Sequence, residues 1–183
     1  MYNKQLNKQV KSYLEVEIPL DHESEWYIDL KDFSRGMPIN WQKGYWHITI
    51  VFIDATPDTE AVSEIIVRHL SSLGEQMIIL DRLEAFTSTG GGTHIIHLSA
   101  SDIPEEFLRT VKGIRKDLAE CGCRIQSSFK LHVTLGRADA SKVEPEEIKA
   151  LLDEVDYTPF RVTLRKYNYR IFRGPVIREW ELE

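Results

Sequence analysis

Two short motifs in the sequence place a histidine and a threonine two residues apart. His47 and Thr49 belong to the segment HITI, and His132 and Thr134 belong to the segment HVTL. Both segments lie in runs of β-forming residues. Because alternate side chains of a strand share a face, each histidine should project beside its threonine. By the same alternation, Phe52 and the isoleucines of the first motif should project from the opposite face.

The chemistry that suits these side chains is displacement at phosphorus. Imidazole titrates near neutral pH, so one histidine can accept a proton while the other donates one. In-line displacement needs a base for the attacking oxygen and an acid for the leaving oxygen. The hydroxyls of Thr49 and Thr134 can donate hydrogen bonds to the non-bridging oxygens. No carboxylate cluster accompanies the motifs in the sequence, so we expect neither a metal ion nor another cofactor.

The composition bounds the kind of protein. The chain has 183 residues, a formal net charge of -6 and 42% hydrophobic residues, and we expect one domain of two lobes over residues 1–183. The acidic balance argues against a large non-specific nucleic-acid surface and favours nucleotides or short RNA ends. The two cysteines are predicted to be reduced thiols. No apolar run has the length of a signal core or a membrane span, so we predict a monomer in the cytoplasm with no membrane partner.

Periodicity and turn residues indicate the elements that position the motifs. Helices are predicted over residues 57–73, 104–121 and 144–155, with a further short helix within residues 21–44. Strands are predicted over residues 13–20, 45–54, 77–86, 93–100, 131–135, 159–172 and 176–183. The turn TSTGGG makes a hairpin of the third and fourth strands. Each half of the chain therefore carries one motif strand, which favours an α+β fold of two similar lobes.

The doubled motif resembles the paired signatures of the two-histidine (2H) phosphoesterase superfamily, the group of 2′,5′-RNA ligase and cyclic phosphodiesterase-like proteins. The resemblance covers roughly residues 13–173, because the segment LEAF before the hairpin and the segment FKLHVTLGR around the second motif also follow the family's order. Two departures are a less regular segment over residues 21–44 and Lys130-Leu131 where a proline is common. The resemblance implies a LigT-like fold, with two pseudo-symmetric lobes of antiparallel sheet, backed by helices, around a central groove.

The resemblance also implies an activity. Members act without metal on 2′,3′-cyclic phosphates or 2′,5′ phosphodiester linkages, in nucleotides or at RNA ends. His47, Thr49, His132 and Thr134 match the family's functional positions and are carried over as catalytic residues, although which histidine is the acid stays open. RNA-end ligation or trimming by the same site is an alternative. A second alternative is a module that binds nucleotides or RNA ends with little turnover. A third is a structural domain in which the histidines lie far apart.

Residues outside the two motifs are further candidates for the site. Tyr45 should share the face of His47 and stack on a base or ribose. Arg137 follows the second motif and would neutralise phosphate, although regular alternation puts it on the face opposite His132. Residues 157–178 interleave basic and aromatic side chains, which suits either nucleotide contact or a solvated edge strand. His94 and His97, three apart on one strand, should face opposite ways and not bind a metal together.

Overall fold

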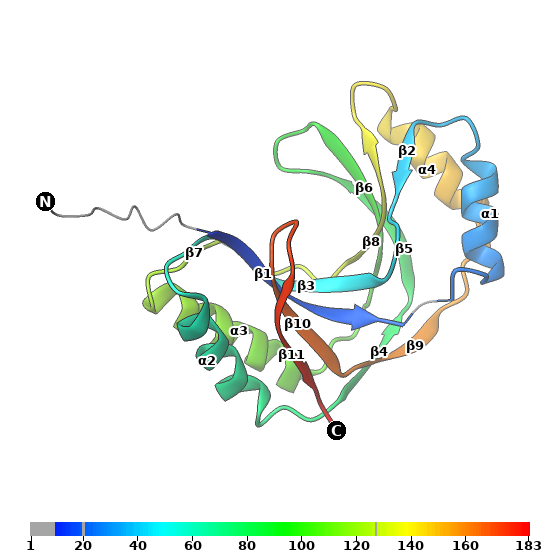
Figure 1. Ribbon diagram of the computed structural model, residues 1–183. Coiled ribbons are helices and arrows are strands. Elements are labelled where there is room, and N and C mark those ends of the chain that lie inside the picture. The colour runs from blue at the N-terminus through cyan, green and yellow to red at the C-terminus, as the bar shows by residue number, and fades with distance from the viewer. Residues whose placement is uncertain (1–9, 20, 127) are drawn as a thin grey trace, which may run out of the picture.

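The computed structural model describes residues 10–19, 21–126 and 128–183. Within these ranges the chain forms four helices and eleven strands (Figure 1). The helices are α1 (Glu25–Phe33), α2 (Thr59–Leu70), α3 (Glu105–Glu120) and α4 (Pro145–Glu154). The strands are β1 (Val10–Ile18), β2 (Ile39–Trp41), β3 (Trp46–Thr56), β4 (Gln76–Leu80), β5 (Arg82–Thr87), β6 (Thr93–Ser99), β7 (Arg124–Ile125), β8 (Val133–Asp139), β9 (Phe160–Leu164), β10 (Lys166–Ile171) and β11 (Val176–Glu181).

Most of the strands form one antiparallel sheet with a sharp change of direction in the middle. Its order is β11-β10-β1-β3-β8-β6-β5, with β7 beside β3 and β2 beside β8. Strands β3 and β8 share a single backbone pair, Ile48 with Val133. The sheet turns at this pair, so that β1, β3, β7, β10 and β11 form one lobe, and β2, β5, β6 and β8 form the other (Figure 1). We call them the His47 lobe and the His132 lobe.

Each lobe has two helices against its sheet. Helices α2 and α3 pack on each other and on strands of the His47 lobe, and α4 packs on α1 and on β5 of the His132 lobe (Figure 1). Asp58 caps α2, because its side chain accepts hydrogen bonds from the backbone N–H groups of Glu60 and Ala61. The predicted bilobal α+β fold of antiparallel sheet backed by helices is confirmed. Among the described residues, the helices are all too short or too polar to cross a bilayer.

Two predicted strands are each divided between different pairings. Residues 77–86 form β4 and β5, which are separated at Asp81; β4 pairs with β9, whereas β5 pairs with β6. Residues 159–172 form β9 and β10, and the latter pairs with β1. β4 and β9 form a small second sheet. The sequence prediction of single strands was wrong here, because a change of pairing partner leaves the hydrophobic alternation nearly intact.

Candidate active site

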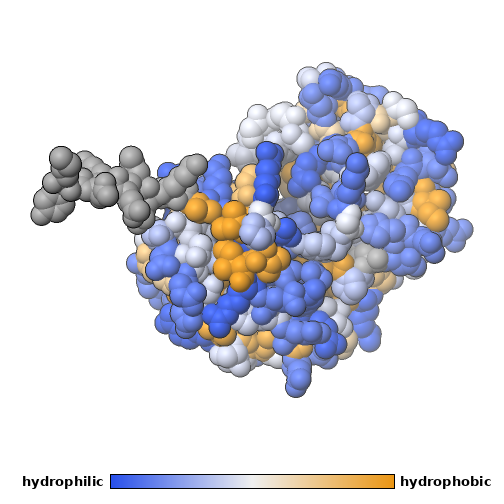
Figure 2. All heavy atoms as spheres, viewed as in Figure 1, coloured by the Kyte–Doolittle hydropathy of each residue, from blue (hydrophilic) through white to orange (hydrophobic). Residues whose placement is uncertain are grey.

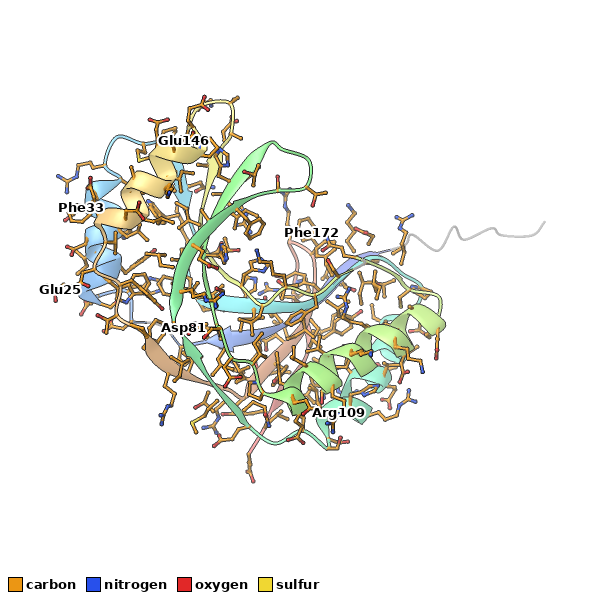
Figure 3. All side chains as sticks on the ribbon, turned by 180° about the vertical axis from the view of Figure 1, so that it is seen from behind. Glu25, Phe33, Asp81, Arg109, Glu146 and Phe172 are labelled. Atoms are coloured by element: carbon orange, nitrogen blue, oxygen red, sulfur yellow. The ribbon has the colours of Figure 1, made fainter. Side chains whose placement is uncertain are left out.

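The two His–Thr motifs lie side by side at the junction of the lobes. Ile48 and Val133, the residues between each histidine and its threonine, are the pair that joins β3 to β8, and both are fully buried. Antiparallel pairing on either side of them places His47 toward Thr134 and Thr49 toward His132. We call the face of the sheet that carries these four half-buried side chains the site face. Side chains from both lobes project into the space within the curved sheet (Figure 3).

A β-bulge follows the first motif. Leu14 of β1 pairs with Val51, whereas the next residue, Glu15, pairs with Thr49, so that Ile50 is an extra residue in β3. A bulge of one residue reverses the alternation beyond it. Phe52 therefore pairs with Tyr13, and their stacked rings lie 6.1 Å apart. The prediction that Phe52 faces away from His47 was wrong for this reason.

The second motif has a bulge at the same position. Ile96 of β6 pairs with Gly136, whereas His97 pairs with Thr134, so that Leu135 is the extra residue in β8. Beyond it, Arg137 returns to the site face. The Arg137 charge lowers the pKa of both His47 and His132, as expected for a cation near both rings. Regular alternation had placed Arg137 on the opposite face, and the bulge corrects that expectation.

His47 lies among aromatic and charged groups of the His47 lobe. Its ring centroid is 6.2 Å from that of Tyr13 and 6.0 Å from that of Tyr45. Its Nδ1 lies 3.6 Å from Oε2 of Glu15. Burial lowers the pKa of His47, the carboxylate of Glu15 works in the opposite direction, and the charges of Arg137, Arg170 and His132 lower it further. Burial and the nearby cations thus favour the neutral ring, whereas Glu15 favours the protonated one.

Glu15 is the centre of a buried polar network. Its side chain is inaccessible to solvent. Oε1 accepts a hydrogen bond from the hydroxyl of Tyr45 and lies 3.6 Å from the guanidinium of Arg170, which donates to the same hydroxyl. Glu15 was not predicted from the sequence, because an acidic residue that alternates with apolar ones in a strand usually faces solvent. The face of β1 that carries Glu15 is the site face.

His132 has a different environment. Its Nδ1 lies 2.8 Å from the backbone carbonyl oxygen of Lys130, and its ring packs edge-on against Phe86 and His97, at centroid distances of 5.6 and 5.9 Å. Burial lowers the pKa of His132, the Lys130 carbonyl raises it, and the charges of Lys130 and Arg137 lower it. Lys130 also lies over the Phe86 ring, 4.2 Å from its centroid. A hollow of about 510 Å³ adjoins Phe86, His97 and Lys130 and reaches α4.

His97 is a second residue that was not predicted to lie at the site. It is 1% exposed, its Nδ1 lies 3.3 Å from the carbonyl oxygen of Ile95, and its Nε2 lies 3.6 Å from Oε2 of Glu84. Burial lowers the pKa of His97 to about 4. His94 faces the other way, as predicted, and its two ring nitrogens contact the Thr87 hydroxyl and the Val143 carbonyl, each at 3.0 Å. His94 is thus a structural residue, whereas His97 lies beside His132.

The basic and aromatic residues of segment 157–178 mostly have structural partners. Tyr167 and Tyr169 are buried in the core. The cations are largely paired within the strands and with α2: Arg165 with Glu181, Lys166 with Glu17 and Glu179, and Arg178 with Glu60 and Glu64. Arg170 differs, because it reaches Tyr45 and Glu15. Most cations of this segment are thus held by structural partners, but the expectation of an edge strand was wrong for β10, which lies between β1 and β11.

The comparisons with known proteins agree with this geometry. A family model described as LigT like phosphoesterase matches residues 98–169, which include the second motif. A solved structure described only as a phosphoesterase has a TM-score of 0.65 at 16% identity, covering 96% of this chain and 99% of that one. Usb1 from Kluyveromyces marxianus gives 0.62 at 15% identity, covering 95% and 99%. LigT from E. coli, solved with NADP+, gives 0.62 at 15% identity, covering 95% and 98%.

The resemblance to the 2H phosphoesterase superfamily is therefore confirmed, by the family match over residues 98–169 and by the LigT-like fold over almost the whole chain. At these identities the solved structures show a common fold and no more. No curated protein sequence matches the chain. Together, the family match and the fold support a function of the phosphoesterase kind, and the particular reaction has to be argued from the site.

Proposed function

We propose that this protein is a metal-independent phosphodiesterase that acts on 2′,3′-cyclic nucleotides or on 2′,5′-linked nucleotides and RNA ends. The observation that carries the proposal is the single pair Ile48–Val133, which sets the two His–Thr motifs side by side on adjacent strands. His47 and His132 are the general acid and base. Thr49 and Thr134 hold the non-bridging phosphoryl oxygens.

The reaction follows from this arrangement. One neutral imidazole takes a proton from water as the water oxygen attacks phosphorus, and the protonated imidazole of the other histidine gives its proton to the leaving ribose oxygen. Both Nδ1 atoms face acceptors, a carboxylate for His47 and a backbone carbonyl for His132. A proton on Nδ1 leaves each Nε2 for the chemistry. In the reverse direction, the two histidines exchange roles.

The surrounding charges suit an anionic substrate. Arg137 lies near both histidines and offers its guanidinium to the phosphate. Tyr45 is 39% exposed beside His47, and its ring is available to stack on a base or ribose. The hollow at Phe86, His97 and Lys130 provides space for a nucleoside on the other side of the site. Solved LigT structures with NADP+, 3′-AMP and ATP, and Usb1 with uridine monophosphate, support a nucleotide as the substrate class.

The test is a panel of 2′,3′-cyclic nucleotides and 2′,5′-linked dinucleotides, assayed with EDTA present. We expect turnover of at least one class, and a fall of about 10²–10⁴-fold in His47→Ala and in His132→Ala, because each variant loses one proton-transfer group. Activity that EDTA abolishes, or that survives in both variants, would contradict the proposal. Tight nucleotide binding without multiple turnover would instead favour a binding module.

A monomeric state, a single domain and a location in the cytoplasm stay predictions.

A further inference from the structure

The two lobes place different residues at one equivalent position. Thr49 of the first motif pairs with Glu15 on β1, and Thr134 of the second motif pairs with His97 on β6. Each partner sits where the register shifts at the bulge, so the two positions correspond. Both side chains are almost fully buried, at 0% and 1% exposure. His47 thus has the carboxylate of Glu15 as a neighbour, whereas His132 has the imidazole of His97.

Glu15 has one oxygen left over for His47. Oε1 is engaged by the Tyr45 hydroxyl and by Arg170, whereas buried Oε2 has no hydrogen-bond partner among the described residues. An unpaired buried carboxylate oxygen is costly. Nδ1 of His47 lies 3.6 Å from this oxygen, which is longer than a hydrogen bond. Such contacts often tighten when a substrate binds.

We propose that Glu15 is a positioning residue for His47: its carboxylate holds the imidazole by Nδ1 and stabilises the protonated ring, so that the two histidines of the site differ in proton affinity. The role of this contact in catalysis rests on the proposed function, whereas the contact between Glu15 and His47 does not depend on it. Among the described residues, the partner of Nδ1 of His132 is the Lys130 carbonyl, and the burial-lowered pKa of His97, about 4, keeps that neighbour uncharged at neutral pH. Tyr45 and Arg170 then act through Glu15, by orienting its carboxylate.

Among the residues that the structure describes, the groups that face His47 come from three strands, the loop before β3 and the residue before β8. β1 supplies Tyr13, Glu15 and Glu17, the loop supplies Tyr45, β8 supplies Arg137, β10 supplies Arg170, and His132 precedes β8. Glu17 pairs with His47 in the β1–β3 register, but its Oε1 is held by Lys166 and by Asn168, at 3.1 and 2.8 Å. Glu15 is therefore the carboxylate that is free to act on His47, and Glu17 provides a matched control of equal charge on the same strand.

The test is an NMR titration of the histidine side-chain nitrogens in wild type, Glu15→Gln and Glu17→Gln, without substrate. In Glu15→Gln we expect the pKa of His47 to fall by about one unit, which is about a tenfold loss of protonated ring at a given pH above it. The Nδ1–H tautomer should also lose population. In Glu17→Gln the shift should be much smaller, and the pKa of His132 should change little in both. An unchanged His47 in Glu15→Gln, or an equal shift in Glu17→Gln, would overturn the proposal.

Two further measurements keep the outcome interpretable. If Glu15→Gln does not fold, Glu15→Asp keeps the charge but withdraws it from Nδ1, and an unchanged tautomer in that variant would equally overturn the proposal. In a protein that turns over a cyclic nucleotide, one apparent pKa of the kcat/KM profile should move in Glu15→Gln. The titration needs no substrate, so it tests the contact between Glu15 and His47 independently of the phosphodiesterase activity. A missing contact would not contradict the activity, and a missing activity would not contradict the contact.

Discussion

Phe52 and Arg137 stand at the same offset from the two motif histidines, and both lie on the site face because a bulged residue precedes each of them. The two bulges fall at the fourth residue of each motif. Identical local geometry in the two lobes thus presents an aromatic ring at one side of the site and a guanidinium at the other. The pseudo-symmetry belongs to the backbone, and the chemistry of the two sides is different.

Arg137 should contribute to substrate binding. We expect Arg137→Ala to lower kcat/KM by about 10- to 100-fold, because charge-assisted hydrogen bonds to phosphate are worth about 1.5–3 kcal/mol. Removal of this cation should also raise the pKa of both motif histidines, since its charge lowers them. Arg35→Ala is the control, because Arg35 is exposed and pairs only with Asp32 among the described residues. Equal kinetics in the two variants would show that Arg137 has no role at the site.

His97 should make the stability of the protein depend on pH. Its pKa is about 4 in the folded chain and about 6.5 when unfolded, so the unfolded state binds more protons between these values. The contribution of His97 to the free energy of unfolding is therefore fully present above about pH 6.5 and is lost as the pH falls toward 4. The total loss is about 2–4 kcal/mol. Urea denaturation at several pH values, in wild type and His97→Gln, measures it. The variant should lose part of the slope, and an identical slope would refute the assignment.

Gly136 allows β2 to pack on β8 next to the second bulge. A Cβ at this position would lie 2.7 Å from the indole of Trp41 and 3.0 Å from Ile39. We expect Gly136→Ala to reduce the free energy of unfolding by about 1–3 kcal/mol, as overpacking does. Gly90→Ala is the control, because a Cβ there meets no atom within 4 Å. Equal stability of both variants in a urea titration would mean that β2 moves away at little cost.

The helices and the two motifs were predictable because their signals are local. Pro57-Asp58 and Gly122 mark helix ends in the sequence, and the alternation around His47 places its threonine beside it. The predicted face of the sheet was wrong for residues beyond the fourth residue of each motif, namely Phe52 and Arg137. A bulge arises from the pairing of two strands, and a single segment carries no mark of it.

Glu15 and His97 were missed for a related reason. An acidic residue in an alternating strand usually faces water, and the face of β1 that carries Glu15 proved to be the site face, with Tyr45 and Arg170 closing over it. His97 gains its meaning from its packing against His132, which the sequence separates from it by α3 and β7. Both depend on tertiary contacts.

An exposed apolar patch near the start of β1 and the β10–β11 hairpin, which includes Phe172 and Val176, is visible in Figure 2. It too was absent from the sequence prediction.

The central claim is that His47 and His132 act as an acid and a base on one phosphodiester. Its most direct test is the pH dependence of kcat/KM for a 2′,3′-cyclic nucleotide with EDTA present, in wild type and in each alanine variant. We predict a bell-shaped profile in the wild type, from which His47→Ala removes one limb and His132→Ala removes the other. A profile that keeps both limbs in either variant would contradict the account.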